Sequence, residues 1–95
     1  MANIKIDYSK ASEKFLNKNS NIITEDKTDE LIIKSIKNIL YKGDENIDLK
    51  RLVNYKPNHY RIRTGKVRII FTLINGIVTV VSVKDIDFRG NVYKR

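Results

Sequence analysis

The chain has no cysteine, no tryptophan and a single histidine among its 95 residues. The absence of cysteine excludes disulfides and thiolate metal sites, and it favours a reducing, cytoplasmic compartment. One histidine cannot build a multi-histidine metal site, so we expect neither a metal nor another cofactor. The sequence also lacks an apolar run of the roughly 18 residues that a membrane span needs, and its first residues lack the apolar core of a signal peptide. We therefore expect no membrane partner.

The length and composition are those of one small globular domain, residues 1–95. Hydrophobic residues make up 41% of the chain and charged residues 32%, which is typical of a folded domain with a thin core. No repeat, low-complexity tract or interdomain linker interrupts it.

The positive charge is concentrated in the second half of the chain. Residues 1–49 carry eight lysines against nine carboxylates, whereas residues 50–95 carry eleven lysines and arginines against two carboxylates, and all six arginines lie there. A basic half-domain of this kind indicates a polyanionic partner, most simply a nucleic acid, although a basic surface also serves solubility.

The first half of the sequence predicts a strand followed by two helices. Alternating isoleucines predict a strand over residues 3–8. Ser9 is a candidate N-cap for a short helix, and Thr24 is a candidate N-cap for a longer helix that ends near Tyr41. Apolar residues recur at helical spacing in both segments: Ala11, Phe15 and Leu16 in the first, and Ile32, Ile36, Ile39 and Leu40 in the second.

The second half predicts a β-meander after a polar connection. Residues 44–58 form the connection, with a short helical turn around residues 49–52. Residues 59–63, 66–73 and 77–84 are rich in branched side chains and predict three strands. The expected fold class is α+β: an N-terminal strand, two helices, a three-strand antiparallel meander and a short C-terminal segment, residues 85–95.

Two tight turns suggest how the three strands pair. If Thr64-Gly65 is a two-residue loop, Arg61 lies opposite Arg68 and Arg63 lies opposite Lys66. Alternation then gathers five basic side chains on one face: His59, Arg61, Arg63, Lys66 and Arg68. Like charges opposed across a strand pair destabilise a sheet, and such violations tend to mark functional sites. A solvated edge with splayed side chains is the alternative.

If Asn75-Gly76 is also a two-residue loop, an apolar patch lies at the far end of that face. Its members are Ile70, Ile74, Ile77 and Val81. A small domain should not leave such a patch in water. We expect the C-terminal segment or a protein partner to cover it.

Three pieces of sequence resemble one family. The run from Tyr60 to Arg68, the following strand from Ile69 to Phe71, and the closing segment from Arg89 to Tyr93 together resemble the RelE/ParE superfamily of toxins. They resemble most the RelE-type endonucleases that cut mRNA on the ribosome (mRNA interferases).

The resemblance implies a RelE-like fold and a specific reaction. It implies attack by an RNA 2′-hydroxyl on the adjacent phosphate without a metal, leaving a 2′,3′-cyclic phosphate and a 5′-hydroxyl. It assigns catalytic roles to Arg61, Arg68, Arg89 and Tyr93, and it matches Arg63 to a second basic residue of the strand. It also implies a cognate antitoxin, mRNA and the ribosome with its 16S rRNA as partners.

The chemistry of these side chains fits phosphate binding better than proton abstraction. Guanidinium forks can clamp a phosphate, but arginine keeps its proton and is a poor base. His59 is the candidate general base, because imidazole exchanges protons near neutral pH. It is otherwise an exposed histidine at the start of a strand. Lys66 and Lys84 are weaker candidates, and Tyr93 either stacks on a base or packs on the sheet.

Two other functions are compatible with the sequence. A ParE-like inhibitor of DNA gyrase has the same fold without the nuclease chemistry. A non-catalytic nucleic-acid-binding module would need only the segregated charge. For any toxin of this type, we expect an antitoxin segment to dock on Ile70, Ile74, Ile77 and Val81 and to place carboxylates near Arg61 and Arg68.

Overall fold

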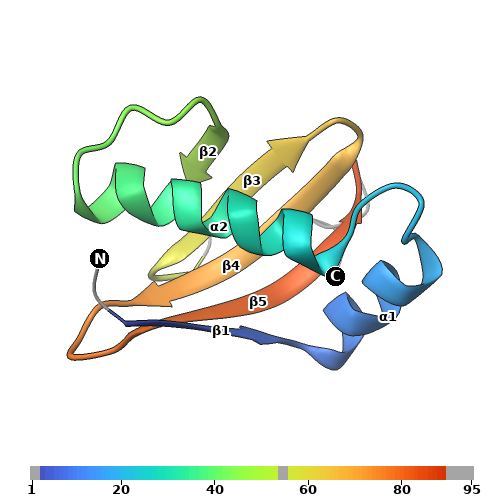
Figure 1. Cartoon of the computed structure of the whole chain (residues 1–95), viewed down its shortest axis with the longest axis horizontal. Helices are drawn as coiled ribbons and strands as arrows, with labels where there is room; N and C mark the ends of the chain where they lie inside the picture. Colours follow the sequence, from blue (N-terminus) through green and yellow to red (C-terminus); the bar gives the residue numbers. More distant parts are fainter. Residues whose placement is uncertain (1–2, 54–55, 90–95) are drawn as a thin grey trace.

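The computed structural model describes residues 3–53 and 56–89. In these ranges, two helices and five strands form an α+β fold in which both helices lie on one face of a single sheet (Figure 1). In chain order the elements are β1 (Ile4–Tyr8), α1 (Lys10–Lys18), α2 (Glu25–Leu40), β2 (Asp48–Arg51), β3 (His59–Thr64), β4 (Val67–Ile74) and β5 (Thr79–Phe88). Neither helix is long and apolar enough to cross a membrane.

The two predicted helices and their N-caps are confirmed. Ser9 Oγ accepts a hydrogen bond from the Ser12 amide at the start of α1, and Thr24 Oγ1 accepts one from the Lys27 amide at the start of α2. Capping by these side chains satisfies amides that the first turn leaves without partners. The helices begin where local sequence predicts because capping depends on only three or four neighbouring residues.

The sheet is mixed, with the strand order β1-β5-β4-β3-β2. β1 runs parallel to β5, whereas the other neighbouring strands are antiparallel. Hydrogen bonds from the Thr79 amide to Asn3 O and from the Ser9 amide to Val83 O hold the two ends of β1 in place. The antiparallel meander predicted from sequence is therefore the centre of a larger sheet.

The predicted helical turn around residues 49–52 is wrong, because this segment forms the edge strand β2. Leu49 pairs with Ile62 of β3 and packs against the core, and the Leu52 amide donates to His59 O just beyond the strand. One apolar residue is too weak a signal to show alternation in a segment of four. The backbone bonds offered by β3 decide its conformation instead.

The register of the first hairpin also differs from the prediction. The two-residue loop is Gly65-Lys66, and Thr64 pairs with Val67, so that Arg63 faces Arg68 and Arg61 faces Ile70. Gly65 has a φ of 56°, and it occupies the first loop position, where a type II′ turn needs glycine. The predicted loop would have used the β-branched Thr64 in that position.

The second hairpin departs further, and the difference turns β5 over. β4 ends at Ile74 and β5 begins at Thr79, so four residues connect them rather than Asn75-Gly76 alone. Leu73 pairs with Val81 and Phe71 with Val83, which exchanges the two faces of β5 relative to the predicted register. The predicted strand over residues 77–84 is therefore displaced toward the C-terminus.

A β-bulge in β5 shapes the part of the sheet nearest the first hairpin. Phe71 pairs with Val83 and Ile70 with Asp85, which leaves Lys84 as the extra residue. Beyond the bulge, Ile86 and Phe88 stay on the helix-covered side, while Asp85 and Asp87 move to the other face. The segment from residue 85 to 88, predicted as part of a covering tail, instead extends the strand.

The core lies between the sheet and the two helices. It includes Ile32 and Ile36 of α2, and Ile62, Ile69, Phe71, Val81, Val83 and Ile86 of the sheet, all exposed by 1% or less. The predicted apolar sides of β3 and β4 are confirmed. Neither helix covers the opposite face of the sheet, which is called the open face below. Several of its side chains are nevertheless buried, among them Arg61, Arg68 and Ile70.

Candidate nucleic-acid interface

Three arginines gather on the open face, as the sequence predicts. Cross-strand pairing places Asp87, Arg68, Arg63 and Asp48 in one row across β5, β4, β3 and β2. The next row contains Asp85, Ile70, Arg61 and Lys50. The arginines therefore lie between carboxylates of both flanking strands, and this end of the face is less uniformly cationic than predicted.

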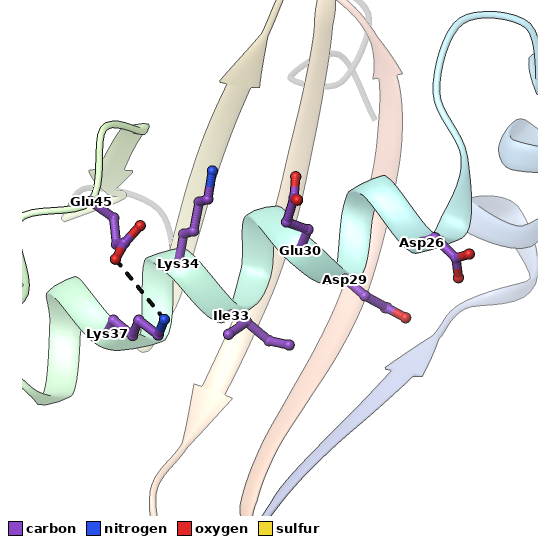
Figure 2. A pocket seen from close by; sticks show the side chains of 7 residues that line it. All are labelled: Asp26, Asp29, Glu30, Ile33, Lys34, Lys37 and Glu45. Carbon is purple, nitrogen blue, oxygen red and sulfur yellow. Dashed lines mark ion pairs between the residues drawn. The ribbon is translucent and has the colours of Figure 1, made fainter. Parts of the chain in front are cut away.

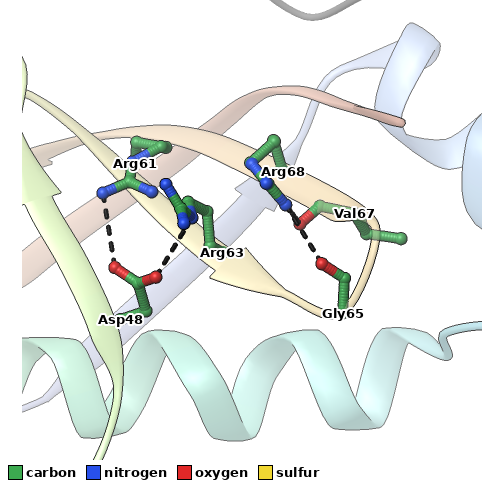
Figure 3. Close-up of polar contacts among 6 residues, drawn as sticks. All are labelled: Asp48, Arg61, Arg63, Gly65, Val67 and Arg68. Carbon is green, nitrogen blue, oxygen red and sulfur yellow. Dashed lines mark hydrogen bonds and ion pairs between the residues drawn. The ribbon is translucent and has the colours of Figure 1, made fainter. Parts of the chain in front are cut away.

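Asp48 contacts two of these arginines (Figure 3). Its Oδ1 lies 3.4 Å from Arg61 Nη2, and its Oδ2 lies 3.1 Å from Arg63 Nε. The Arg61 side chain is 7% exposed, whereas those of Arg63 and Asp48 are about half exposed. Arg61 Nη1 is buried and has no hydrogen-bond partner among the described residues. A buried, incompletely satisfied guanidinium is costly for stability, which is typical of a functional position.

The opposed pair Arg63 and Arg68 avoids repulsion by diverging. Arg63 points toward Asp48, whereas Arg68 Nη1 donates to Gly65 O at 3.2 Å and Val67 O at 3.1 Å (Figure 3). Arg68 is buried, and backbone carbonyls of the hairpin hold its guanidinium in place. Two different partners thus fix two adjacent cations, and the fold tolerates the like-charge pair.

The remaining predicted RNA-binding and catalytic residues are distributed differently. His59 lies on the open face opposite Thr72, and its Nδ1 is 2.8 Å from Pro57 O. Because a carbonyl only accepts, Nδ1 carries the proton in this contact, so Nε2 is the basic nitrogen of the neutral ring. Lys66 lies in the turn, and its Nζ is 5.7 Å from the centre of the Phe88 ring. The prediction that Lys66 shares the arginine face is wrong.

The C-terminal candidates are described only in part. The Arg89 amide donates to Lys66 O at 2.8 Å, which places the exposed Arg89 directly beside the first hairpin. Its position is compatible with the predicted role at the arginine cluster. Tyr93 lies outside the described residues.

Of the four residues predicted to form an exposed apolar patch for an antitoxin, only Ile74 and Ile77 are exposed. Ile74 and Ile77 are 63% and 98% exposed, near the β4–β5 loop. Ile70 is buried, and Val81 is fully buried beneath the helices because β5 is turned over. Val78, which the sequence did not single out, is 41% exposed and adjoins Ile77. The exposed part of the predicted patch therefore lies at the end of β4 and in the β4–β5 loop.

Hollows lie beside both helices. The one between α1 and β5, about 370 Å³, is lined by Lys14, Lys18, Phe15 and Phe88 together with Asp87 from the arginine row. The one along α2, about 390 Å³, is lined by four carboxylates and two lysines: Asp26, Asp29, Glu30, Glu45, Lys34 and Lys37 (Figure 2). Its excess of carboxylates disfavours a polyanion.

The hydrogen bond and the ion pair along α2 stabilise the fold. The Tyr8 hydroxyl donates to Asp29 Oδ1 at 2.5 Å. Burial, and then this hydrogen bond, raise the pKa of Tyr8 well above its ordinary range. The Lys27 ammonium, 2.7 Å from Glu30, lowers the pKa of that exposed carboxyl. These interactions tie β1 to α2 and stabilise the helix, and they lie away from the arginine cluster.

Sequence reasoning missed Asp48 and Asp85 as neighbours of the arginines. Asp48 falls in a segment with no clear strand pattern, and the β-bulge that turns Asp85 and Asp87 toward Arg68 leaves no mark in the sequence. In residues 3–53 and 56–89, no three histidine, aspartate or glutamate side chains are grouped so that they could hold a metal ion.

Comparisons with known proteins give the fold. The structure is similar to a chain of the RelB-RelE antitoxin-toxin complex from Methanococcus jannaschii, with a TM-score of 0.50 and 23% identity over 92% of this chain and 94% of that chain. The predicted RelE-like fold is therefore confirmed. Comparison of the sequence with family models and with curated proteins gave no match.

Proposed function

We propose that this protein is the toxin of a toxin-antitoxin system and that it cleaves mRNA on the ribosome. Two observations support the proposal. The fold is similar to a chain of an antitoxin-toxin complex, and the sequence from Tyr60 to Arg68 and from Arg89 to Tyr93 resembles RelE-type endonucleases. This function would place the protein in the cytoplasm, where ribosomes translate.

The arrangement of Arg61, Arg63 and Arg68 carries the proposal. Adjacent strands bring three guanidinium groups together on the open face, where Arg63 is half exposed and Arg61 and Arg68 are buried. In the proposed reaction the 2′-oxygen attacks phosphorus, the bond to the 5′-oxygen breaks, and negative charge accumulates on the phosphorane oxygens. Preorganised cations stabilise that charge without having to be assembled during the reaction.

Each candidate side chain has a distinct role in this proposal. Arg61 and Arg68 are fixed by their surroundings and clamp the reacting phosphate, and Arg89 closes the site from the side of the hairpin. Arg63 is half exposed and contacts the same phosphate as Arg61. His59 Nε2 takes the proton of the 2′-hydroxyl, and Tyr93 stacks on a nucleotide base. Lys66 contributes long-range attraction for RNA from the turn.

A cognate antitoxin completes the proposal. The exposed apolar tip formed by Ile74, Ile77 and Val78 is the surface on which an antitoxin segment packs, with its carboxylates directed toward the arginines. Substitution of Ile77 by aspartate leaves an exposed position exposed. It should weaken copurification with the antitoxin while leaving toxicity intact.

Induced expression of arginine variants tests the proposed function. Arg68→Ala and Arg61→Met should relieve growth inhibition, whereas Lys42→Ala, an exposed lysine beyond the end of α2, should not. Full toxicity of both arginine variants would contradict the phosphate-clamp assignment. Intact mRNA together with double-strand breaks in DNA would indicate a gyrase inhibitor, and RNA binding without cleavage would indicate a binding module.

A further inference from the structure

The contact of Asp48 with two arginines has the form of an anion site that is already occupied. One carboxylate oxygen lies 3.4 Å from Arg61 Nη2 and the other lies 3.1 Å from Arg63 Nε, and Figure 3 shows the carboxylate directed at both guanidinium groups. Two guanidinium groups that converge on two oxygens of one anion also form the geometry in which arginines hold a phosphate. We call this position, between Arg61 and Arg63, the anion seat.

The seat differs in rigidity between its two sides. The Arg61 side chain is 7% exposed, whereas the Asp48 side chain is 51% exposed. Asp48 is the first residue of β2, a strand of four residues that pairs only with β3 at the edge of the sheet. Edge elements with little buried surface open at a lower free energy than the core. Asp48 can therefore leave the seat while Arg61 stays in place.

The carboxylate also fills the seat incompletely. Both oxygens of Asp48 are engaged, yet Arg61 Nη1 is buried without a hydrogen-bond partner in the described part of the chain. Neither carboxylate oxygen pairs with Nη1, whereas a phosphate group has additional oxygens in a tetrahedral arrangement. A phosphate in the seat can keep the two contacts that Asp48 makes and accept a hydrogen bond from Nη1 as well.

We propose that Asp48 is an internal competitor for phosphate, and that a phosphate group displaces it from the anion seat. The identity of that group as an RNA phosphate rests on the proposed function, but the exchange requires only a phosphate. The competitor lowers the affinity of the isolated protein for RNA. Productive binding then depends on RNA that is already positioned, as mRNA is on a ribosome.

The test compares Asp48→Asn with the wild-type chain. Asparagine keeps the shape of the side chain and removes its charge, so the dissociation constant for a single-stranded RNA oligonucleotide should fall about tenfold at fixed salt, measured by fluorescence anisotropy. Asp44→Asn removes the same charge from an exposed position in the same connection and should change affinity by no more than about twofold. In an Arg63→Gln background, Asp48→Asn should give no gain.

A titration with inorganic phosphate separates this inference from the proposed function. The Arg63 Nε–H resonance should shift at a lower phosphate concentration in Asp48→Asn than in the wild type. If Asp48→Asn binds RNA and phosphate no better than the wild type, or more weakly, Asp48 merely positions the arginines and the competitor role is wrong, even where toxicity depends on Arg61. Tighter phosphate binding without any mRNA cleavage would support the seat and contradict only the proposed function.

Discussion

Arg61→Met separates the stability of the fold from its function. Arg61 lies in β3 opposite Ile70 of β4 and is 6% exposed. Its Nη1 is buried without a partner among the described residues. Methionine retains an unbranched, flexible side chain of similar reach and removes the charge. The neighbouring carboxylate of Asp48 keeps its contact with Arg63, so the substitution leaves no buried charge without a counterion.

The magnitude follows from two opposing effects. Relief of a buried, unsatisfied N–H group is worth about 1–3 kcal/mol. Loss of the 3.4 Å ion pair costs about 0–1 kcal/mol, because Asp48 is half exposed and solvent screens the interaction. The free energy of unfolding of Arg61→Met should therefore rise by about 1 kcal/mol, in line with apolar replacement of buried ion pairs in other proteins.

Urea unfolding measures this change directly. The midpoint should rise with an unchanged slope, and the thermal midpoint should rise by about 4–8 °C for a domain of this size. Arg63→Met is the matched control, since Arg63 is half exposed, and it should alter stability by no more than about 0.5 kcal/mol. Destabilisation of Arg61→Met by more than about 1 kcal/mol would refute the reasoning, because the guanidinium would then be a net stabilising group.

Two further predictions concern other parts of the molecule. Val81→Asp should destabilise the fold by more than about 3 kcal/mol and yield insoluble protein, because Val81 is fully buried. Ile77→Asp should change the free energy of unfolding by no more than about 0.5 kcal/mol in the same unfolding assay. Equal effects of the two substitutions would contradict the observed register of β5. Tyr8→Phe should lower the free energy of unfolding by about 1 kcal/mol near neutral pH through loss of the hydrogen bond to Asp29. The folded state raises the pKa of Tyr8 above its ordinary value of 10.0, so the free energy of unfolding of the wild type should decline as pH rises past about 10. If Tyr8→Phe shows the same decline, the decline belongs to another group.

Local signals in the sequence were sufficient for the helices and for the faces of β3 and β4. Capping by Ser9 and Thr24 depends on residues within the same turn. Alternation along β3 and the first residues of β4 separates basic from apolar side chains. The gathering of Arg61, Arg63 and Arg68 on one face followed from this alternation together with a two-residue loop. It holds although the loop is Gly65-Lys66, because the loop length is the same as predicted.

The pairing of β5 could not be predicted in the same way. Asn75-Gly76 has the sequence of a tight hairpin, yet neither residue adopts a positive φ, and the loop lengthens to four residues. The longer loop brings Val81 and Val83 onto the core, where they bury more apolar surface than Val80 and Ser82 would. Packing across the whole sheet therefore overrides the preference of the turn.

The anion seat depends on contacts that are distant in sequence. Asp48 is 13 residues from Arg61, in a segment whose strand character comes from β3. Without that pairing, nothing distinguishes Asp48 from the other acidic residues in the first half of the chain. Only the assembled sheet shows that it neutralises part of the arginine cluster.

Cleavage of mRNA in a purified translation system tests the central claim most directly. The purified protein is added to ribosomes stalled on a defined mRNA, and the 5′ ends and terminal groups of the products are mapped. The account predicts cuts within the ribosome-protected codons, with 5′-hydroxyl and 2′,3′-cyclic phosphate ends, that disappear with Arg61→Met and Arg68→Ala. Intact mRNA on these ribosomes, or cleavage that persists in both arginine variants, would contradict it.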